Sequence, residues 1–203
     1  GNRDVTPDAP APTVVSETLV TRHIFRELPD AVDARMRSVC AVAPGVLGVT
    51  GVETLEMAKG IVEHVGPRVA IVIDALAARA ASRLGTTVQI ADTGIQPGSG
   101  VGNHRSALTQ ETLGVPVIAI GVPMVIYAAT IVRDALEGMT QGAKEEAADA
   151  IEKEVLGTAL GEMIVTPREI DDLVKDSARM LASGINRALH PGLSDREISE
   201  LMA

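Results

Sequence analysis

Short apolar runs alternate along this chain with amphipathic stretches of helical spacing. The runs are rich in Val and Ile, which is typical of strands buried on both faces of a sheet, and they lie at residues 38–43, 68–73, 86–91 and 115–122. Helical patterns separate them, at residues 13–28, 53–65, 75–84 and 123–137. The alternation predicts an α/β fold in which helices flank a sheet. In such folds ligands bind at the carboxyl ends of strands.

Helix-start signals support three of the predicted helices. Thr50 with Glu53 fits a capping box at the start of the second helix. Thr166, followed by a proline and then a glutamate at the third helical position, predicts a further helix that runs to about Leu189. Ser194, with a glutamate three residues later, begins a last short helix.

Composition narrows the classes of function. The chain has 203 residues, of which 46% are hydrophobic, but Phe25 and Tyr127 are its only aromatic residues. Two aromatic rings cannot build base-stacking platforms or sugar-stacking grooves. Lys and Arg number 18 against 27 Asp and Glu, and the net charge of −9 argues against direct binding to nucleic-acid phosphates. The sequence contains no apolar run of about eighteen residues that would span a membrane, and no secretory signal is visible.

Cys40 is the single cysteine, so an intrachain disulfide is impossible and the chain fits a reducing cytosol. It lies in the apolar run at residues 38–43. A thiol in a buried strand packs as a small apolar group, and we therefore expect Cys40 to be buried and inert rather than a nucleophile.

Aspartates at expected strand ends are the strongest candidates for chemistry. Asp74 directly follows five apolar residues, where an ionised carboxylate is costly unless it is used or paired. Two interpretations stay open for it: a functional group, or a cap on the helix predicted to follow. Asp92 follows the next predicted strand, and Asp8 would share this position if a strand precedes Gly1. Where two carboxylates meet, one keeps a proton while the other acts as a base, which can activate water against a peptide carbonyl.

A glycine-rich loop at residues 94–103 is the second candidate. Its backbone N–H groups can meet an anion or a developing oxyanion, although its spacing is neither that of a P-loop nor that of a dinucleotide fold. A loop packed under the sheet edge is the alternative. His104 and Arg105 beside it either bind substrate or form a solvated basic pair. Ser99 does not stand in the Gly-x-Ser-x-Gly spacing of a nucleophile elbow. The four histidines show no metal-ligand spacing.

Several longer stretches of the chain recur together in one known family. They are Val5-Thr6-Pro7-Asp8-Ala9 and residues 1–2, 21–23, 44–54, 73–79, 92–103, 111–123, 165–171 and 184–190. In this combination, which covers nearly the whole chain, the sequence resembles the germination (spore) protease of spore-forming bacteria.

The resemblance implies an endopeptidase that degrades small acid-soluble spore proteins during germination, in the cytoplasm of the forespore and the spore core. It also implies a zymogen processed by self-cleavage, a homotetramer, and no cofactor. The family is grouped with atypical aspartic peptidases and is similar in its core to the hydrogenase-maturation peptidases. The fold that this implies is a three-layer α/β/α arrangement with a mostly parallel, mixed sheet of the phosphorylase/hydrolase-like type.

The resemblance also implies a catalytic pair, because the two carboxylates proposed for the family fall on Asp8 and Asp74. We add the glycine-rich loop as the candidate for contacts to the substrate. The residues expected to make these contacts are Gly98, Ser99, Gly100, Gly102, Asn103 and His104.

The expected organisation is a single peptidase domain over residues 1–203 that lacks the family's N-terminal region. Within it, residues 139–161 are expected to hold a flexible joint and a charged helix. An alternative to the enzyme is a non-catalytic fragment or degenerate homologue that acts only through assembly. A further alternative, suggested by the hydrogenase-maturation peptidases, is a metal held by the acidic site.

Overall fold

A computed structural model describes residues 1–98, 105–139, 154 and 163–202. The helices are α1 (Pro10–Ser16), α2 (Arg22–Glu27), α3 (Leu47–Thr50), α4 (Thr54–Val65), α5 (Gln110–Leu113), α6 (Ala128–Met139), α8 (Ile170–Leu189) and α9 (Asp195–Met202). The strands are β1 (Ala70–Ala78), β2 (Gln89–Ala91), β3 (Val117–Tyr127) and β4 (Ile164–Val165), and 3-10 turns lie at Thr6–Asp8, Pro29–Ala31 and Ala81–Arg83. The expected charged segment falls outside the described residues, apart from Glu154, while Met139 at the start of the expected joint belongs to α6.

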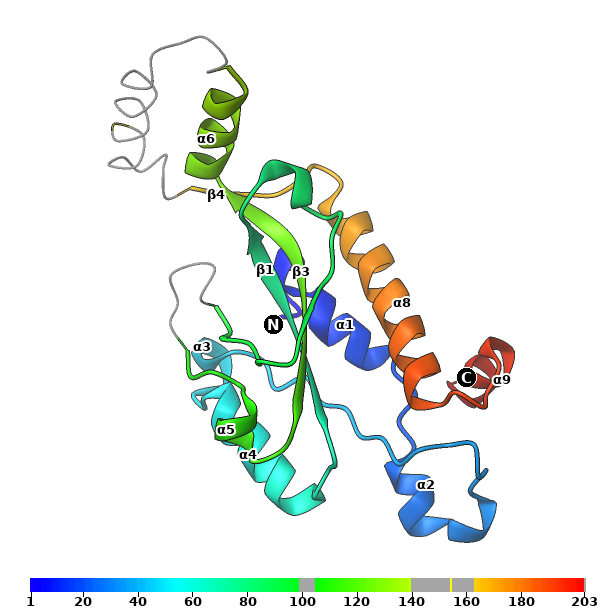
Figure 1. The fold of residues 1–203 in the computed structure, drawn as a ribbon. Coiled ribbons are helices and arrows are strands. Elements are labelled where there is room, and N and C mark those ends of the chain that lie inside the picture. Colours follow the sequence, from blue (N-terminus) through cyan, green and yellow to red (C-terminus); the bar gives the residue numbers. More distant parts are fainter. Residues whose placement is uncertain (99–104, 140–153, 155–162, 203) are drawn as a thin grey trace.

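The sheet is open and mixed (Figure 1). β3 is its centre: β1 pairs with β3 in parallel, and β2 and the short β4 pair with it antiparallel. Within the described residues, β1 therefore has a neighbour on one side only.

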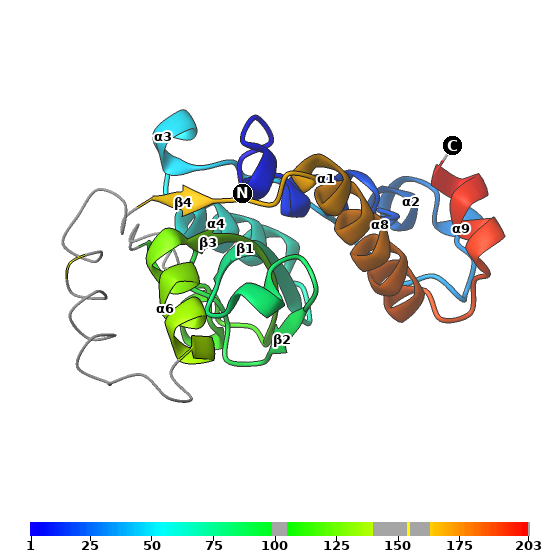
Figure 2. The same cartoon turned by 90° about the horizontal axis from the view of Figure 1, so that it is seen from above.

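Two apolar clusters cover the two faces of the sheet. On one face, Ile71 and Ile73 of β1 and Val122 of β3 pack with α1 and α8, which lie side by side (Figure 1). On the other face, Val72 and Val117 pack with residues of α4, α5 and the loop before α5. The alternation of side chains along a strand separates the two sets. The chain therefore has the predicted α/β fold with helices on both sides of the sheet, which Figure 2 shows from above.

The helix predicted at residues 75–84 is wrong, because β1 continues through this segment to Ala78. The segment is rich in alanine, which favours a helix in isolation. In the fold it lies beside β3, which is also longer than predicted and runs through Pro123 to Tyr127. The register shifts directly after the Leu76–Pro123 pair, so that Met124 is an extra residue of β3, and such bulges are places where a sheet tolerates proline. The helix predicted at residues 123–137 accordingly begins only at Ala128.

The helix predicted at residues 13–28 is divided into α1 and α2, because tertiary hydrogen bonds hold the backbone between them. The Leu19 N–H donates to Asn186 Oδ1 at 2.9 Å, and Asn186 Nδ2 donates to the Glu17 carbonyl at 3.0 Å. Asn186 belongs to α8 and is only 4% exposed. Two side-chain bonds from another helix thus replace local helical bonds.

The strand predicted at residues 38–43 is also wrong. These residues are extended but join no sheet, and Thr21 and Arg22 both donate their N–H groups to the Val39 carbonyl. Cys40 is consequently exposed, not buried as expected. An apolar run therefore lies along the surface in this structure, with Val42 52% exposed.

Several predicted boundaries are confirmed. α8 ends at Leu189, and Ser194 caps α9 by exchanging hydrogen bonds with Glu197. α4 begins one residue later than predicted, and the partner of Glu53 in its capping box is Glu56, not Thr50. Among the described helices, none combines the length and hydropathy that a membrane span requires.

Candidate active site

Asp74 lies in the middle of β1 rather than at its carboxyl end. Its Cα pairs with Gly121 of β3, and the strand continues for four residues beyond it. Its side chain is 11% exposed, and its carboxylate accepts the N–H groups of Ala75 and Gly98. Because no helix follows Asp74, its interpretation as a helix cap is wrong.

Asp8 reaches the same region from the N-terminal turn. It ends the 3-10 turn Thr6–Asp8, which contacts β1, β3 and α8. Its Oδ2 accepts the Asn2 N–H at 2.6 Å, and its own N–H donates to the Val5 carbonyl at 2.8 Å. α1 starts two residues later at Pro10, a residue suited to a first helical position, so the turn is anchored by a helix packed on α8.

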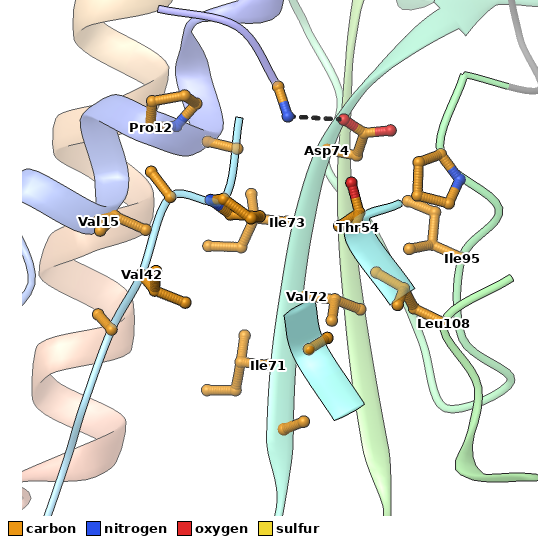
Figure 3. A pocket seen from close by; sticks show the side chains of 18 of the residues that line it. Pro12, Val15, Val42, Thr54, Ile71, Val72, Ile73, Asp74, Ile95 and Leu108 are labelled. Atoms are coloured by element: carbon orange, nitrogen blue, oxygen red, sulfur yellow. Dashed lines mark ion pairs between the residues drawn. The ribbon is translucent and has the colours of Figure 1, made fainter. Parts of the chain in front are cut away.

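The two carboxylates are electrostatically coupled. Burial raises the pKa of Asp74 above its ordinary value, and the negative charge of Asp8 raises it further. Burial also raises the pKa of Asp8, against the opposing effect of the hydrogen bond from the Asn2 N–H. The Gly1 nitrogen lies 3.8 Å from Asp74 Oδ1 (Figure 3). Asp74 is the more buried of the two carboxylates, and burial disfavours its charged form.

Both carboxylates line one large cleft of about 1410 Å³. It follows β1 and is bounded by α1, α4 and the extended residues 38–47. Figure 3 shows Ile71 and Ile73 pointing from β1 toward Val15 and Val42, whereas Val72 points to the other side. The cleft is thus mainly apolar, with the two aspartates as paired polar groups in its wall.

The glycine-rich loop contributes Gly98 to this cleft. Gly94, at φ +88°, lets Ile95 pair with Leu108, and this pairing fixes the start of the loop. Gly98, at φ +71°, then directs its N–H to the Asp74 carboxylate. The predicted contact residues Ser99, Gly100, Gly102, Asn103 and His104 lie outside the described part of the chain.

The sheet separates Asp92 from the other two aspartates. Asp92 does follow a strand, as predicted, but β2 is antiparallel to β3, whereas β1 is parallel to it. β3 lies between β1 and β2, so Asp92, at the end of β2, is on the other side of β3 from Asp74. Asp92 is exposed there.

Glu53 was predicted only as part of a capping box, and Thr54 was not among the predicted site residues. Both line the cleft at the start of α4, and Thr54 is drawn beside Asp74 in Figure 3. Glu53 Oε2 is buried without a hydrogen-bond partner among the described residues. The capping signal located the start of α4 to within one residue, but the position of that start on the cleft depends on tertiary packing.

No group of three or more His, Cys, Asp or Glu side chains in the described segments is arranged to hold a metal ion. The chemistry that the described residues themselves offer is acid–base chemistry by two coupled carboxylates, with backbone N–H groups beside them.

The fold and site together define an α/β protein with an apolar, strand-sized cleft that contains paired carboxylates. Comparison with known families gives a match to the germination protease family over residues 1–150 and 135–201. The chain belongs to the germination protease family.

Its relatives include germination proteases from several spore formers. That of Clostridium acetobutylicum is 46% identical over 217 residues, covering 98% of this chain and 66% of the relative. That of Caldanaerobacter subterraneus subsp. tengcongensis is 46% identical over 219 residues, covering 100% of this chain and 68% of the relative. That of Bacillus subtilis is 42% identical, covering 96% and 66%. The chain thus spans about two thirds of the length of these relatives.

Proposed function

We propose that this chain forms the peptidase core of an endopeptidase in which Asp8 and Asp74 activate a water molecule. Its proposed substrates are small acid-soluble spore proteins. The observation that carries the proposal is the coupling of these two carboxylates in one cleft, each with a pKa raised first of all by burial. Membership of a family of proteases supports it.

In the proposed mechanism the pair shares one proton, which rests on the more buried Asp74. Asp8 accepts a proton from water as its oxygen bonds to the peptide carbonyl carbon. The C–N bond then breaks, and Asp74 gives its proton to the leaving nitrogen, so that a carboxylic acid and an amine are released. One carboxyl group is protonated at the start and one at the end, which balances the reaction.

The Gly98 N–H has a positioning role in this proposal. A hydrogen bond from a backbone N–H favours the ionised form of a carboxylate and so opposes the effect of burial on the pKa of Asp74. The bond also fixes the orientation of the Asp74 side chain. The glycine-rich loop thereby links substrate contact to the geometry of the carboxylate pair.

The experiment is cleavage of a purified small acid-soluble spore protein, followed by gel electrophoresis and mass spectrometry. Asp8→Asn and Asp74→Asn should each lower the cleavage rate by about 10²–10⁴-fold, the usual effect of removing a general acid or base. Asp4→Asn is the matched control, because Asp4 is an exposed aspartate of the same N-terminal segment, and it should leave the rate unchanged.

Two outcomes would contradict the proposal. Undiminished cleavage by both Asn variants would remove the carboxylate pair from the mechanism. An untouched substrate in the presence of the unaltered chain would favour the alternative of a non-catalytic homologue that acts through assembly. The tetramer and the spore-core location implied by the family resemblance stay predictions, and light scattering of the purified chain tests the first.

A further inference from the structure

The alternation of side chains along β1 fixes the face of the sheet on which Asp74 lies. Ile71 and Ile73 pack in the apolar cluster with α1 and α8, whereas Ala70 and Val72 pack in the cluster with α4 and α5. Positions 70, 72 and 74 share one face, because the pairing of β1 with β3 runs through this stretch without a shift in register. The Asp74 side chain therefore points to the α4 side of the sheet.

The start of α4 lies close to Asp74. Only residues 66–69 join α4 to β1, and the helix runs back alongside the strand (Figure 1). From its last residue back to Thr54 the helix rises about 16 Å, and β1 rises about 13 Å from its first residue to Asp74. Leu55, the residue after Thr54, packs in the same cluster as Val72. Figure 3 agrees with this placement, because the Thr54 hydroxyl points toward Asp74 there.

Thr54 does not use its hydroxyl to cap α4. Helices α5 and α9 are capped by the hydroxyl oxygens of Thr109 and Ser194, which accept backbone N–H groups of the first turn. The cap of α4 is instead the box of Glu53 with Glu56, in which the Glu53 N–H donates to Glu56 Oε2 at 3.0 Å. Thr54 follows as the first helical residue and lines the cleft. Its hydroxyl is therefore available to the site.

The Asp74 carboxylate can accept a further hydrogen bond. An ionised carboxylate has about four acceptor positions on its two oxygens. Asp74 accepts the N–H groups of Ala75 and Gly98, which are both backbone donors. Its side chain is only 11% exposed, so a donor on the protein replaces water that this position largely lacks.

We propose that Thr54 is a positioning residue of the peptidase, whose hydroxyl donates a hydrogen bond to the Asp74 carboxylate and holds that side chain in its reactive orientation. The bond is strongest when Asp74 is ionised, because a charged acceptor binds a hydroxyl proton more strongly than a neutral one. It therefore favours the step in which Asp74 gives its proton to the leaving nitrogen. This inference rests on the proposed peptidase function, which assigns that step to Asp74.

The first test does not depend on catalysis. NMR titration of the isotope-labelled carboxyl carbon of Asp74 measures its pKa in the wild-type chain and in Thr54→Val. A donor to the ionised form lowers the pKa of a carboxyl group, so loss of the hydroxyl should raise the pKa of Asp74, by about one pH unit. Thr54→Ser keeps a hydroxyl at this position and should restore the wild-type titration.

Thr50→Val is the matched control. Thr50 lies shortly before α4, its hydroxyl donates to the carbonyl groups of Val46 and Val52, and it does not line the cleft. This variant should leave the titration of Asp74 unchanged. Every variant also keeps the other ionisable groups on the segments around Asp74, so they cannot produce a difference; these groups are Asp8, Glu53, Arg105 and the Gly1 nitrogen.

The second test is the rate of cleavage of a purified small acid-soluble spore protein. Thr54→Val should lower kcat by about 10–100-fold with little change in KM, because the hydroxyl acts on proton transfer and not on substrate binding. The alkaline limb of the pH–rate profile, where Asp74 loses the proton that it must donate, should move to higher pH. Thr54→Ser should restore both the rate and the profile.

Three outcomes would overturn the proposal. One is an Asp74 titration that is the same in Thr54→Val and in the wild-type chain. The others are an equal shift in Thr50→Val and a failure of Thr54→Ser to restore the titration, because the effect would then come from a disturbed helix start and not from the hydroxyl.

Failure of this proposal can be told apart from failure of the proposed function. Spore-protein cleavage that depends on Asp8 and Asp74, together with an unchanged Asp74 titration in Thr54→Val, would overturn the role of Thr54 and leave the peptidase intact. A raised pKa of Asp74 in Thr54→Val, found in a chain that cleaves no spore protein, would support the hydrogen bond but overturn its catalytic role along with the proposed function.

Discussion

The side chain of Asn186 should be one of the most important single polar groups for stability, and Asn186→Ala tests this. In the wild-type protein its amide accepts the Leu19 N–H at 2.9 Å and donates to the Glu17 carbonyl at 3.0 Å. Both Asn186 and Leu19 are 4% exposed, so water cannot replace the lost bonds without entering the core. The substitution leaves one donor and one acceptor of the α1–α2 connection without partners.

The size of the effect follows from this count. A buried polar group that loses its partner costs about 1–3 kcal/mol, and the Glu17 carbonyl, which is only partly buried, belongs at the lower end. The sum is a loss of about 2–4 kcal/mol in the free energy of unfolding, or about 4–16 °C in Tm for a chain of this size. Urea unfolding followed by far-UV circular dichroism measures it.

Two further variants separate hydrogen bonding from volume and from position on α8. Asn186→Leu restores the volume but not the bonds, and it should be destabilised nearly as much as Asn186→Ala. Ser183→Ala changes an exposed position of the same helix and should be neutral or slightly stabilising. If Asn186→Leu were as stable as the wild-type protein, the reasoning from unsatisfied buried groups would be refuted.

Three more predictions concern pH and backbone strain. Because burial raises the pKa of Asp74, the folded chain binds the Asp74 proton more tightly than the unfolded chain, and the free energy of unfolding falls as pH rises from 3.8 through the raised pKa. Asp74→Asn should therefore be more stable than the wild-type protein at pH 7. Urea titrations should show that this advantage is lost below pH 3.8. Burial lowers the pKa of His190 below 6.5, so the contribution of neutral His190 to the free energy of unfolding is complete above pH 6.5 and declines as pH falls from there. The stability of His190→Gln should therefore decline less steeply between pH 7 and 5 than that of the wild-type protein. Gly94→Ala would place a Cβ 2.3 Å from the Leu108 carbonyl oxygen at φ +88°, and it should lower the free energy of unfolding by about 2–4 kcal/mol. Gly114→Ala, at φ +75° with no atom within 4 Å, should lower it by only about 1–2 kcal/mol. Equal losses of stability in thermal unfolding would contradict this prediction.

The helix predicted after Asp74 shows how local preference was overridden. Alanine-rich residues favour a helix when only neighbours along the chain are considered. In the fold, β1 pairs with β3 as far as Ile126. Leu76 also packs over Gly121, where an added Cβ would lie 2.3 Å from the Leu76 side chain. Gly121 lies 45 positions after Leu76, so a pattern of neighbouring residues cannot show that Gly121 leaves room for the Leu76 side chain.

In the candidate site, too, some features follow from a local sequence pattern and others depend on tertiary contacts. Asp74 was singled out because an ionisable group follows a buried apolar run, and that pattern is local. Its pairing with Asp8 came from family resemblance, since spacing along the chain carries no information on which loops meet. Asp92 fits the same local pattern as Asp74 but is exposed elsewhere, because the direction of β2 in the sheet is a tertiary property.

The sequence by itself determined the α/β class, the family, the last residue of α8 and the start of α9, because periodicity, motifs and caps depend on residues close along the chain. Only the tertiary structure decided that Asp74 lies within a strand, that Asp8 and Gly98 meet it, and that the edge of β1 faces an apolar cleft. These features arise from hydrogen bonds and packing between segments far apart in sequence, whose partners a local pattern does not specify.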